Sequence, residues 1–129
     1  MNQILVIEDE ADMAATYDRL LRRAGHRVVT ADSRAAGLQL LKSVCPKLVI
    51  SDLRLPDGDG LDIIRAAHAI DPPPPVIIIT AFASRAAREA SLKSGASAFL
   101  AKPFGIAEFS SLVEDLVSHR RQAPAQEGS

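Results

Sequence analysis

The side chains with the most chemical potential in this sequence follow short apolar runs: Glu8, Asp9, Asp52, Thr80 and Lys102. A carboxylate is costly to remove from water unless a cation or a metal ion pairs with it. Without such a cation, three neighbouring carboxylates would repel one another. Oxygen ligands without histidine or cysteine suit Mg²⁺ or Mn²⁺ better than zinc. We therefore expect Glu8, Asp9 and Asp52 to bind Mg²⁺, or alternatively Mn²⁺, with Lys102 beside them.

Such a site could transfer a phosphoryl group. A carboxylate such as that of Asp52 is a competent nucleophile toward phosphorus and forms an acyl phosphate. Mg²⁺ neutralises the charge that develops on phosphoryl oxygens. The ammonium of Lys102 and the hydroxyl of Thr80 could contact further phosphoryl oxygens. The histidines are expected at helix ends or on polar faces, as solvated surface residues: His26, His68 and His119.

These polar residues need strands to hold them. Three continuous, β-branched runs predict strands that are buried on both faces of a parallel sheet, at residues 4–7, 48–50 and 76–79. Two weaker runs, at residues 28–31 and 98–101, are better suited to the edges of that sheet. Asp9, Asp52, Thr80 and Lys102 then stand at the carboxyl ends of four of these strands.

Five segments between and after the strands carry apolar residues at helical spacing, which predicts five helices. Five strand-then-helix units require right-handed crossovers and predict an α/β fold, a doubly wound five-stranded parallel sheet. Folds of this type place their ligands in a crevice at the carboxyl ends of the strands. The polar residues are therefore expected to line one crevice.

Composition limits the possible partners and surroundings. The chain of 129 residues suggests one domain, and a net charge of -1 without a basic block proposes neither nucleic acid nor an anionic membrane as a partner. No apolar run is long enough to span a bilayer. The single cysteine excludes an internal disulfide and fits a cytoplasmic location. Residues 120–129 are polar, and we expect them to form a disordered tail after a domain of residues 1–119.

Four stretches together resemble the receiver domain of two-component response regulators. They occur in the order of the family and at plausible spacing: residues 6–10 (VIEDE), 51–60 (SDLRLPDGDG), 79–81 (ITA) and 101–104 (AKPF). The resemblance covers the chain from its start to about Ser118. It implies a flavodoxin-like sheet of strand order 2-1-3-4-5.

The resemblance also implies roles for individual residues. Asp52 matches the aspartate that is phosphorylated, and Glu8 and Asp9 match the acidic pair that holds Mg²⁺. Arg54 matches the position whose backbone carbonyl also binds the metal. Thr80 and Lys102 would contact the phosphoryl group.

Two further positions of the resemblance concern the response to phosphorylation. Thr80 and Phe99 match the switch pair, in which the aromatic ring turns inward when the threonine engages phosphate. The family more often has tyrosine where Phe99 stands, so no phenolic hydroxyl can signal here. Lys102-Pro103 matches a turn whose peptide bond is usually cis in the family.

The function implied is a signalling switch rather than a conventional enzyme. A histidine kinase or histidine phosphotransferase would phosphorylate Asp52, and the domain would catalyse its own phosphorylation and dephosphorylation. Affinity for an unknown downstream protein would change at the surface of the fourth helix, fifth strand and fifth helix. That surface could also form a weak dimer of an otherwise monomeric protein. The chain is either a stand-alone receiver or part of a longer protein.

Two other functions are considered. A phosphatase of the haloacid dehalogenase type also forms an aspartyl phosphate, but it needs a second aspartate where Arg54 stands. A receiver-like binding module that is not phosphorylated usually lacks an acidic or lysine residue of the site, and none is missing here. Arg54 and Phe82, each two residues after a site residue, flank the route of the hydrolytic water in the family. Their bulk predicts slow autodephosphorylation.

Overall fold

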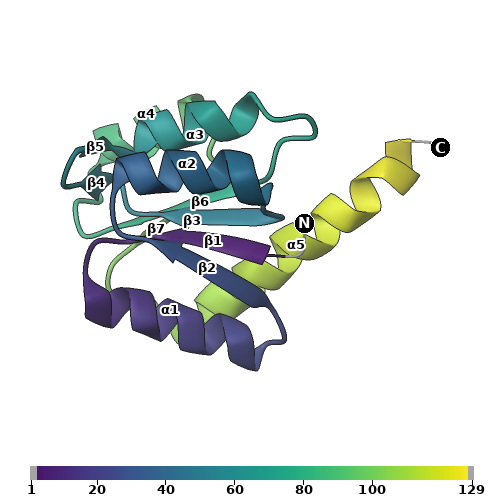
Figure 1. Cartoon of the computed structure of the whole chain (residues 1–129), viewed down its shortest axis with the longest axis horizontal. Coiled ribbons are helices and arrows are strands. Elements are labelled where there is room, and N and C mark those ends of the chain that lie inside the picture. Colours follow the sequence, from purple (N-terminus) through teal and green to yellow (C-terminus); the bar gives the residue numbers. More distant parts are fainter. Residues whose placement is uncertain (1–2, 128–129) are drawn as a thin grey trace.

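The computed structural model describes residues 3–127, with side chains described for residues 3–118. Strands and helices alternate along most of the chain (Figure 1). The elements are β1 (Gln3–Ile7), α1 (Ala11–Arg23), β2 (Arg27–Ala31), α2 (Arg34–Val44), β3 (Leu48–Ser51), β4 (Arg54–Leu55), β5 (Gly58–Asp59), α3 (Gly60–His68), β6 (Val76–Thr80), α4 (Arg85–Lys93), β7 (Ala98–Ala101) and α5 (Ile106–Glu127).

Five strands form one parallel sheet in the order β2-β1-β3-β6-β7. Because β4 and β5 form a separate pair, β6 and β7 are the fourth and fifth strands of this sheet. The predicted order 2-1-3-4-5 and the doubly wound α/β class are therefore confirmed. The two weaker runs of the sequence, now β2 and β7, are the edge strands as expected.

Both faces of the sheet are covered, because side chains alternate along each strand. From β1, Ile4 and Val6 enter an apolar cluster shared with α1 and α5, which lie together on one face in Figure 1. Leu5 and Ile7 enter the other cluster, which includes residues of α2 and α3. Gly37 of α2 packs directly against Ile7, where a Cβ would lie 2.6 Å from the Ile7 side chain. This close contact holds α2 against the end of β1, next to Glu8.

Helix α5 continues to Glu127 and so includes residues 120–127 of the predicted tail. The expectation of a disordered tail at residues 120–129 stays a prediction. Residues 128–129 lie outside the described residues. The boundary of the domain at residue 119 stays a prediction.

One histidine was also predicted wrongly. The side chain of His26 is only 8% exposed, with Nε2 2.7 Å from Oε2 of Glu114 and Nδ1 3.0 Å from Nζ of Lys47. His68 is exposed, as expected. The side chain of His119 lies outside those that the structure describes. Within the described part of the chain, none of the helices has the length and apolar character needed to cross a membrane.

Candidate functional site

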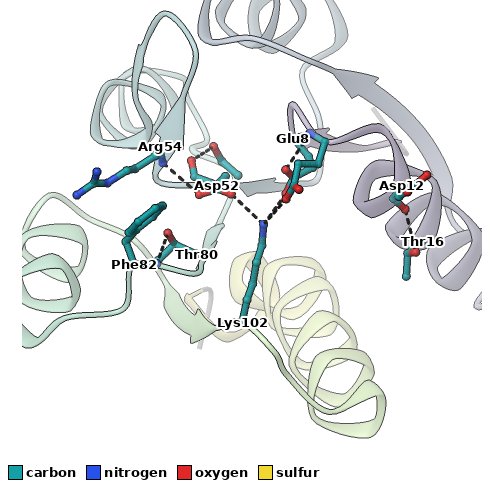
Figure 2. Close-up of polar contacts among 10 residues, drawn as sticks. Glu8, Asp12, Thr16, Asp52, Arg54, Thr80, Phe82 and Lys102 are labelled. Carbon is teal, nitrogen blue, oxygen red and sulfur yellow. Dashed lines mark hydrogen bonds and ion pairs between the residues drawn. The ribbon is translucent and has the colours of Figure 1, made fainter.

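Four of the predicted site residues meet where the parallel strands end. Glu8 and Asp9 follow β1, Asp52 follows β3 and Lys102 follows β7. The Lys102 ammonium donates to Oδ2 of Asp52 at 2.9 Å and to Oε1 of Glu8 at 3.0 Å (Figure 2). These contacts join residues that are 50 and 94 positions apart in the sequence. The ends of parallel strands therefore assemble the cluster that the residue types predict.

Glu8, Asp9 and Asp52 offer a plausible set of metal ligands. One carboxylate oxygen of each lies within 4.8 Å of the others. Glu8 is buried, Asp52 is partly buried and Asp9 is exposed, so the cluster faces solvent on one side. All the donors are carboxylate oxygens, a set that fits a hard divalent cation such as Mg²⁺.

Burial and charge act against each other at this cluster. Burial alone would lower the pKa of Lys102, but its hydrogen bonds with Asp52 and Glu8 raise that pKa above its ordinary value. Burial raises the pKa of Glu8, although the hydrogen bond from Lys102 opposes this effect. Lys102 thus stays charged and partly neutralises the carboxylates, as the sequence predicts for a cation beside Asp52.

The backbone after Asp52 holds its carboxylate in place. The N–H of Arg54 donates to Oδ1 of Asp52 at 3.1 Å, while Oδ2 accepts from Lys102. The N–H of Gly60 donates to the carbonyl of Leu53 at 2.7 Å. A Cβ at Gly60 would lie 2.5 Å from the Asp52 carbonyl oxygen, so only glycine allows this close approach. Both carboxylate oxygens of Asp52 therefore have fixed partners.

Thr80 also stands at the carboxyl end of its strand, but no described hydrogen bond joins its side chain to Asp52. Its side chain is fully buried at the end of β6, and Oγ1 accepts from the N–H of Phe82 at 3.1 Å. The guanidinium carbon of Arg54 lies 4.2 Å from the centre of the Phe82 ring. Figure 2 shows Arg54 and Phe82 side by side, next to Asp52 and Thr80. The two bulky residues thus contact each other beside the site.

Comparison with known proteins identifies the family. A family model described as the response regulator receiver domain matches residues 4–114. The chain belongs to this family.

Curated and solved relatives agree with this assignment. The chain is 35% identical over 127 residues to the transcriptional regulatory protein PrrA of Mycobacterium leprae (strain TN), covering 98% of this chain and 54% of that protein. It is also 34% identical over 118 residues to PrrA of Mycobacterium tuberculosis (strain ATCC 25618 / H37Rv). That match covers 92% of this chain and 51% of that protein. The chain thus spans about half the length of these curated relatives.

Two solved structures resemble the fold closely. The signal receiver domain of a putative Luxo repressor protein from Vibrio parahaemolyticus has a TM-score of 0.90 at 26% identity, covering 99% of this chain and 98% of that one. A response regulator protein from Burkholderia pseudomallei has a TM-score of 0.79 at 28% identity, covering 98% and 73%. Its structure contains a phosphorylated aspartic acid, a calcium ion and citrate.

Phe99 and the Lys102-Pro103 turn, the positions to which the resemblance assigns a switch and a turn, belong to β7 and to the segment that follows it. Phe99 is partly buried on the edge strand β7 and packs against the cluster of α2 and α3. It also lines a shallow groove with residues of α4 and α5, such as Leu92 and Leu112. The Lys102-Pro103 peptide is cis, as the resemblance implies. The following residue, Phe104, stacks on the ring of Tyr17 with their centres 5.9 Å apart.

Sequence reasoning missed one group of contacts beside the site. The segment after Asp52 forms a two-stranded hairpin, β4–β5, which the strand and helix patterns of the sequence did not predict. Asp57 at its tip accepts hydrogen bonds from the start of α2. No local pattern could have revealed this, because the partners are 22 and 23 residues apart.

Proposed function

We propose that Asp52 of this receiver domain accepts a phosphoryl group from a histidine kinase or a histidine phosphotransferase in a Mg²⁺-dependent reaction. The observation that carries this proposal is the contact of Lys102 with both Asp52 and Glu8. It places a cation and an acidic cluster around one carboxylate at the ligand-binding edge of the sheet. The phosphorylated aspartic acid in the Burkholderia pseudomallei relative supports the same chemistry.

In the proposed reaction, a carboxylate oxygen of Asp52 attacks the phosphorus of a phosphohistidine. The new P–O bond forms as the P–N bond breaks, and the electron pair of that bond stays on the donor imidazole. The Arg54 N–H and the Lys102 ammonium hold the carboxylate in one orientation, which lowers the entropic cost of attack. A Mg²⁺ ion bound by Glu8, Asp9, Asp52 and the Arg54 carbonyl would neutralise charge on the phosphoryl oxygens.

After transfer, Lys102 would keep its position beside Asp52 and contact a phosphoryl oxygen. The Thr80 hydroxyl would leave the Phe82 N–H and engage another oxygen. Phe99 would then turn inward, and the groove of α4, β7 and α5 would change shape. The partners at this surface are a downstream protein or a second copy of the chain. The domain itself would act as a phosphoacceptor that catalyses its own phosphorylation and dephosphorylation, not as a conventional enzyme.

The experiment that tests this proposal is intact mass after incubation with a small acyl phosphate. We expect the wild type to gain one phosphoryl group in the presence of Mg²⁺, and neither Asp52→Asn nor metal-free wild type to gain it. Asp71→Asn is the matched control. Asp71 is exposed and precedes β6, so it lies at the amino ends of the strands, away from Asp52. A folded wild type that binds Mg²⁺ but gains no mass would instead be a receiver-like binding module.

A phosphatase of the haloacid dehalogenase type finds no support in these observations. The residue two positions after Asp52 is Arg54, where this class of enzyme needs a second aspartate, and its guanidinium lies against the Phe82 ring. The family match also covers most of the chain.

A further inference from the structure

The hairpin that follows Asp52 is tied to the start of a different helix. At its tip, Oδ1 of Asp57 accepts from the backbone N–H of Arg34 at 2.7 Å. Oδ2 of the same carboxylate accepts from the N–H of Ala35 at 2.9 Å. Arg34 and Ala35 are the first two residues of α2. One side chain therefore joins the β4–β5 hairpin to the N-terminus of α2.

These two bonds complete the capping of α2. The first N–H groups of a helix have no partner within the helix, and their partial positive charge favours a carboxylate. Ser33, the N-cap, accepts from Ala36 at 3.1 Å through its side chain. Asp57 accepts from the N–H groups of Arg34 and Ala35, the two helix residues that precede Ala36. Its hydrogen bonds from Ala35 and Arg34 lower the pKa of the Asp57 carboxyl below its ordinary value.

The Arg34 side chain adds a second connection between α2 and this segment. Its Nε donates to Oδ2 of Asp62 on α3 at 2.8 Å. On the way, its Cδ crosses Gly58 so closely that a Cβ at Gly58 would overlap it. The hairpin is thus held from its tip by Asp57 and along its side by Arg34.

The tether leads to the residues that hold Asp52. Within the hairpin, Leu55 pairs with Gly58 and Arg54 pairs with Asp59. The N–H of Arg54 donates to the Asp52 carboxylate. Arg54 is also the residue whose carbonyl is expected to bind the metal. A displacement of the hairpin would therefore move a partner of the phosphoacceptor and a metal ligand together.

We propose that Asp57 is a positioning residue, which fixes the Arg54 backbone against Asp52 by anchoring the β4–β5 hairpin to α2. The consequence for Mg²⁺ binding rests on the proposed function, whereas the anchoring itself does not. Asp57 touches neither Asp52 nor Lys102 in any described contact, so it acts through Arg54.

Amide hydrogen exchange on the metal-free protein tests the anchoring directly. Asp57→Ala should accelerate exchange of the Arg54 and Gly60 amides by about tenfold, because both depend on the position of the hairpin. Ser33→Ala is the matched control: it removes a cap from the same helix without touching the hairpin. It should accelerate exchange at Ala36 and leave Arg54 unchanged. Asp57→Asn, which keeps one acceptor oxygen, should give an intermediate rate at Arg54.

A calorimetric titration with Mg²⁺ alone then tests the consequence. Asp57→Ala should weaken Mg²⁺ binding by about tenfold, as loss of a residue that orients a metal ligand does. Ser33→Ala should leave the Kd unchanged even though it also destabilises α2. Equal effects of the two variants, or wild-type exchange at Arg54 in Asp57→Ala, would overturn the inference. If Asp57→Ala and Ser33→Ala change amide exchange as expected but the wild type takes no phosphoryl group, the proposed function is refuted and the anchoring stands.

Discussion

Replacing Lys102 by methionine should tighten Mg²⁺ binding while it impairs phosphorylation. The methionine side chain keeps much of the length of lysine but removes the ammonium that contacts Glu8 and Asp52. In the wild type, that positive charge repels any cation held by the same carboxylates. The two expected effects have opposite signs because Lys102 competes with the metal and would also contact the phosphoryl group.

The size of the first effect follows from the geometry of the cluster. The ligand oxygens of Glu8, Asp9 and Asp52 lie within 4.8 Å of one another. If the Lys102 ammonium and a bound Mg²⁺ are taken to be that far apart, Coulomb's law gives roughly 1.7 kcal/mol between their charges in water. This energy corresponds to a Kd lowered by about twentyfold.

Isothermal titration calorimetry with Mg²⁺ measures the Kd, and intact mass after incubation with an acyl phosphate measures the phosphorylation rate. Lys93→Met is the control, since it removes the same charge from an exposed position on α4. A Kd for Lys102→Met that equals or exceeds the wild-type value would refute the electrostatic reasoning. A normal phosphorylation rate would refute the role of Lys102 in binding the phosphoryl group.

Two further predictions concern phosphoryl lifetime and pH. An exposed cation–π contact contributes about 0.5–1 kcal/mol, so Arg54→Ala and Phe82→Ala should each speed loss of the phosphoryl group about twofold to fivefold. Intact mass followed over time measures this, and unchanged decay would contradict it. Because the pKa of Glu8 is raised above 4.5, the folded protein binds more protons than the unfolded chain just above that pH. The contribution of Glu8 to stability therefore decreases as the pH rises through this window. Protonation of Glu8 also removes a metal ligand. As the solution is acidified, Mg²⁺ affinity should therefore already begin to fall while the pH is still above 4.5. The Mg²⁺ affinity of Glu8→Gln, measured against pH, should lack this decrease. If Glu8→Gln shows the same pH dependence as the wild type, Glu8 is not a ligand.

Local patterns in the sequence predicted much of the fold. The strands β1, β3 and β6 are uninterrupted β-branched runs, and such runs are stable only when both faces of a sheet are covered. Helix boundaries also have local causes: Gly25, with a φ of 93°, follows α1, and Ser33 is the N-cap of α2. The strand order came from the resemblance to the receiver family, because the runs alone do not determine which strands are neighbours.

The candidate site was predicted because its residues follow strands. Once a parallel sheet is expected, Glu8, Asp52 and Lys102 must come to the same edge, whatever their distance in the sequence. Side-chain geometry was beyond this reasoning. The Thr80 hydroxyl, for example, accepts from Phe82, and no hydrogen bond described in residues 3–118 joins it to Asp52.

Only the tertiary structure decided the contacts between distant polar groups. The His26 side chain, for example, contacts Glu114, 88 residues away. Likewise, Asp57 stands in a segment rich in turn residues, and nothing nearby shows that its acceptors meet the N-terminus of α2. The sequence by itself determined the strands and helices of the five strand-then-helix units, because hydrophobic periodicity is a local property. It also indicated the edge of the sheet at which the polar residues gather, because these residues directly follow strands. The hydrogen bonds that hold this edge in place required the packed structure, because their partners become neighbours only when the sheet and its helices have assembled.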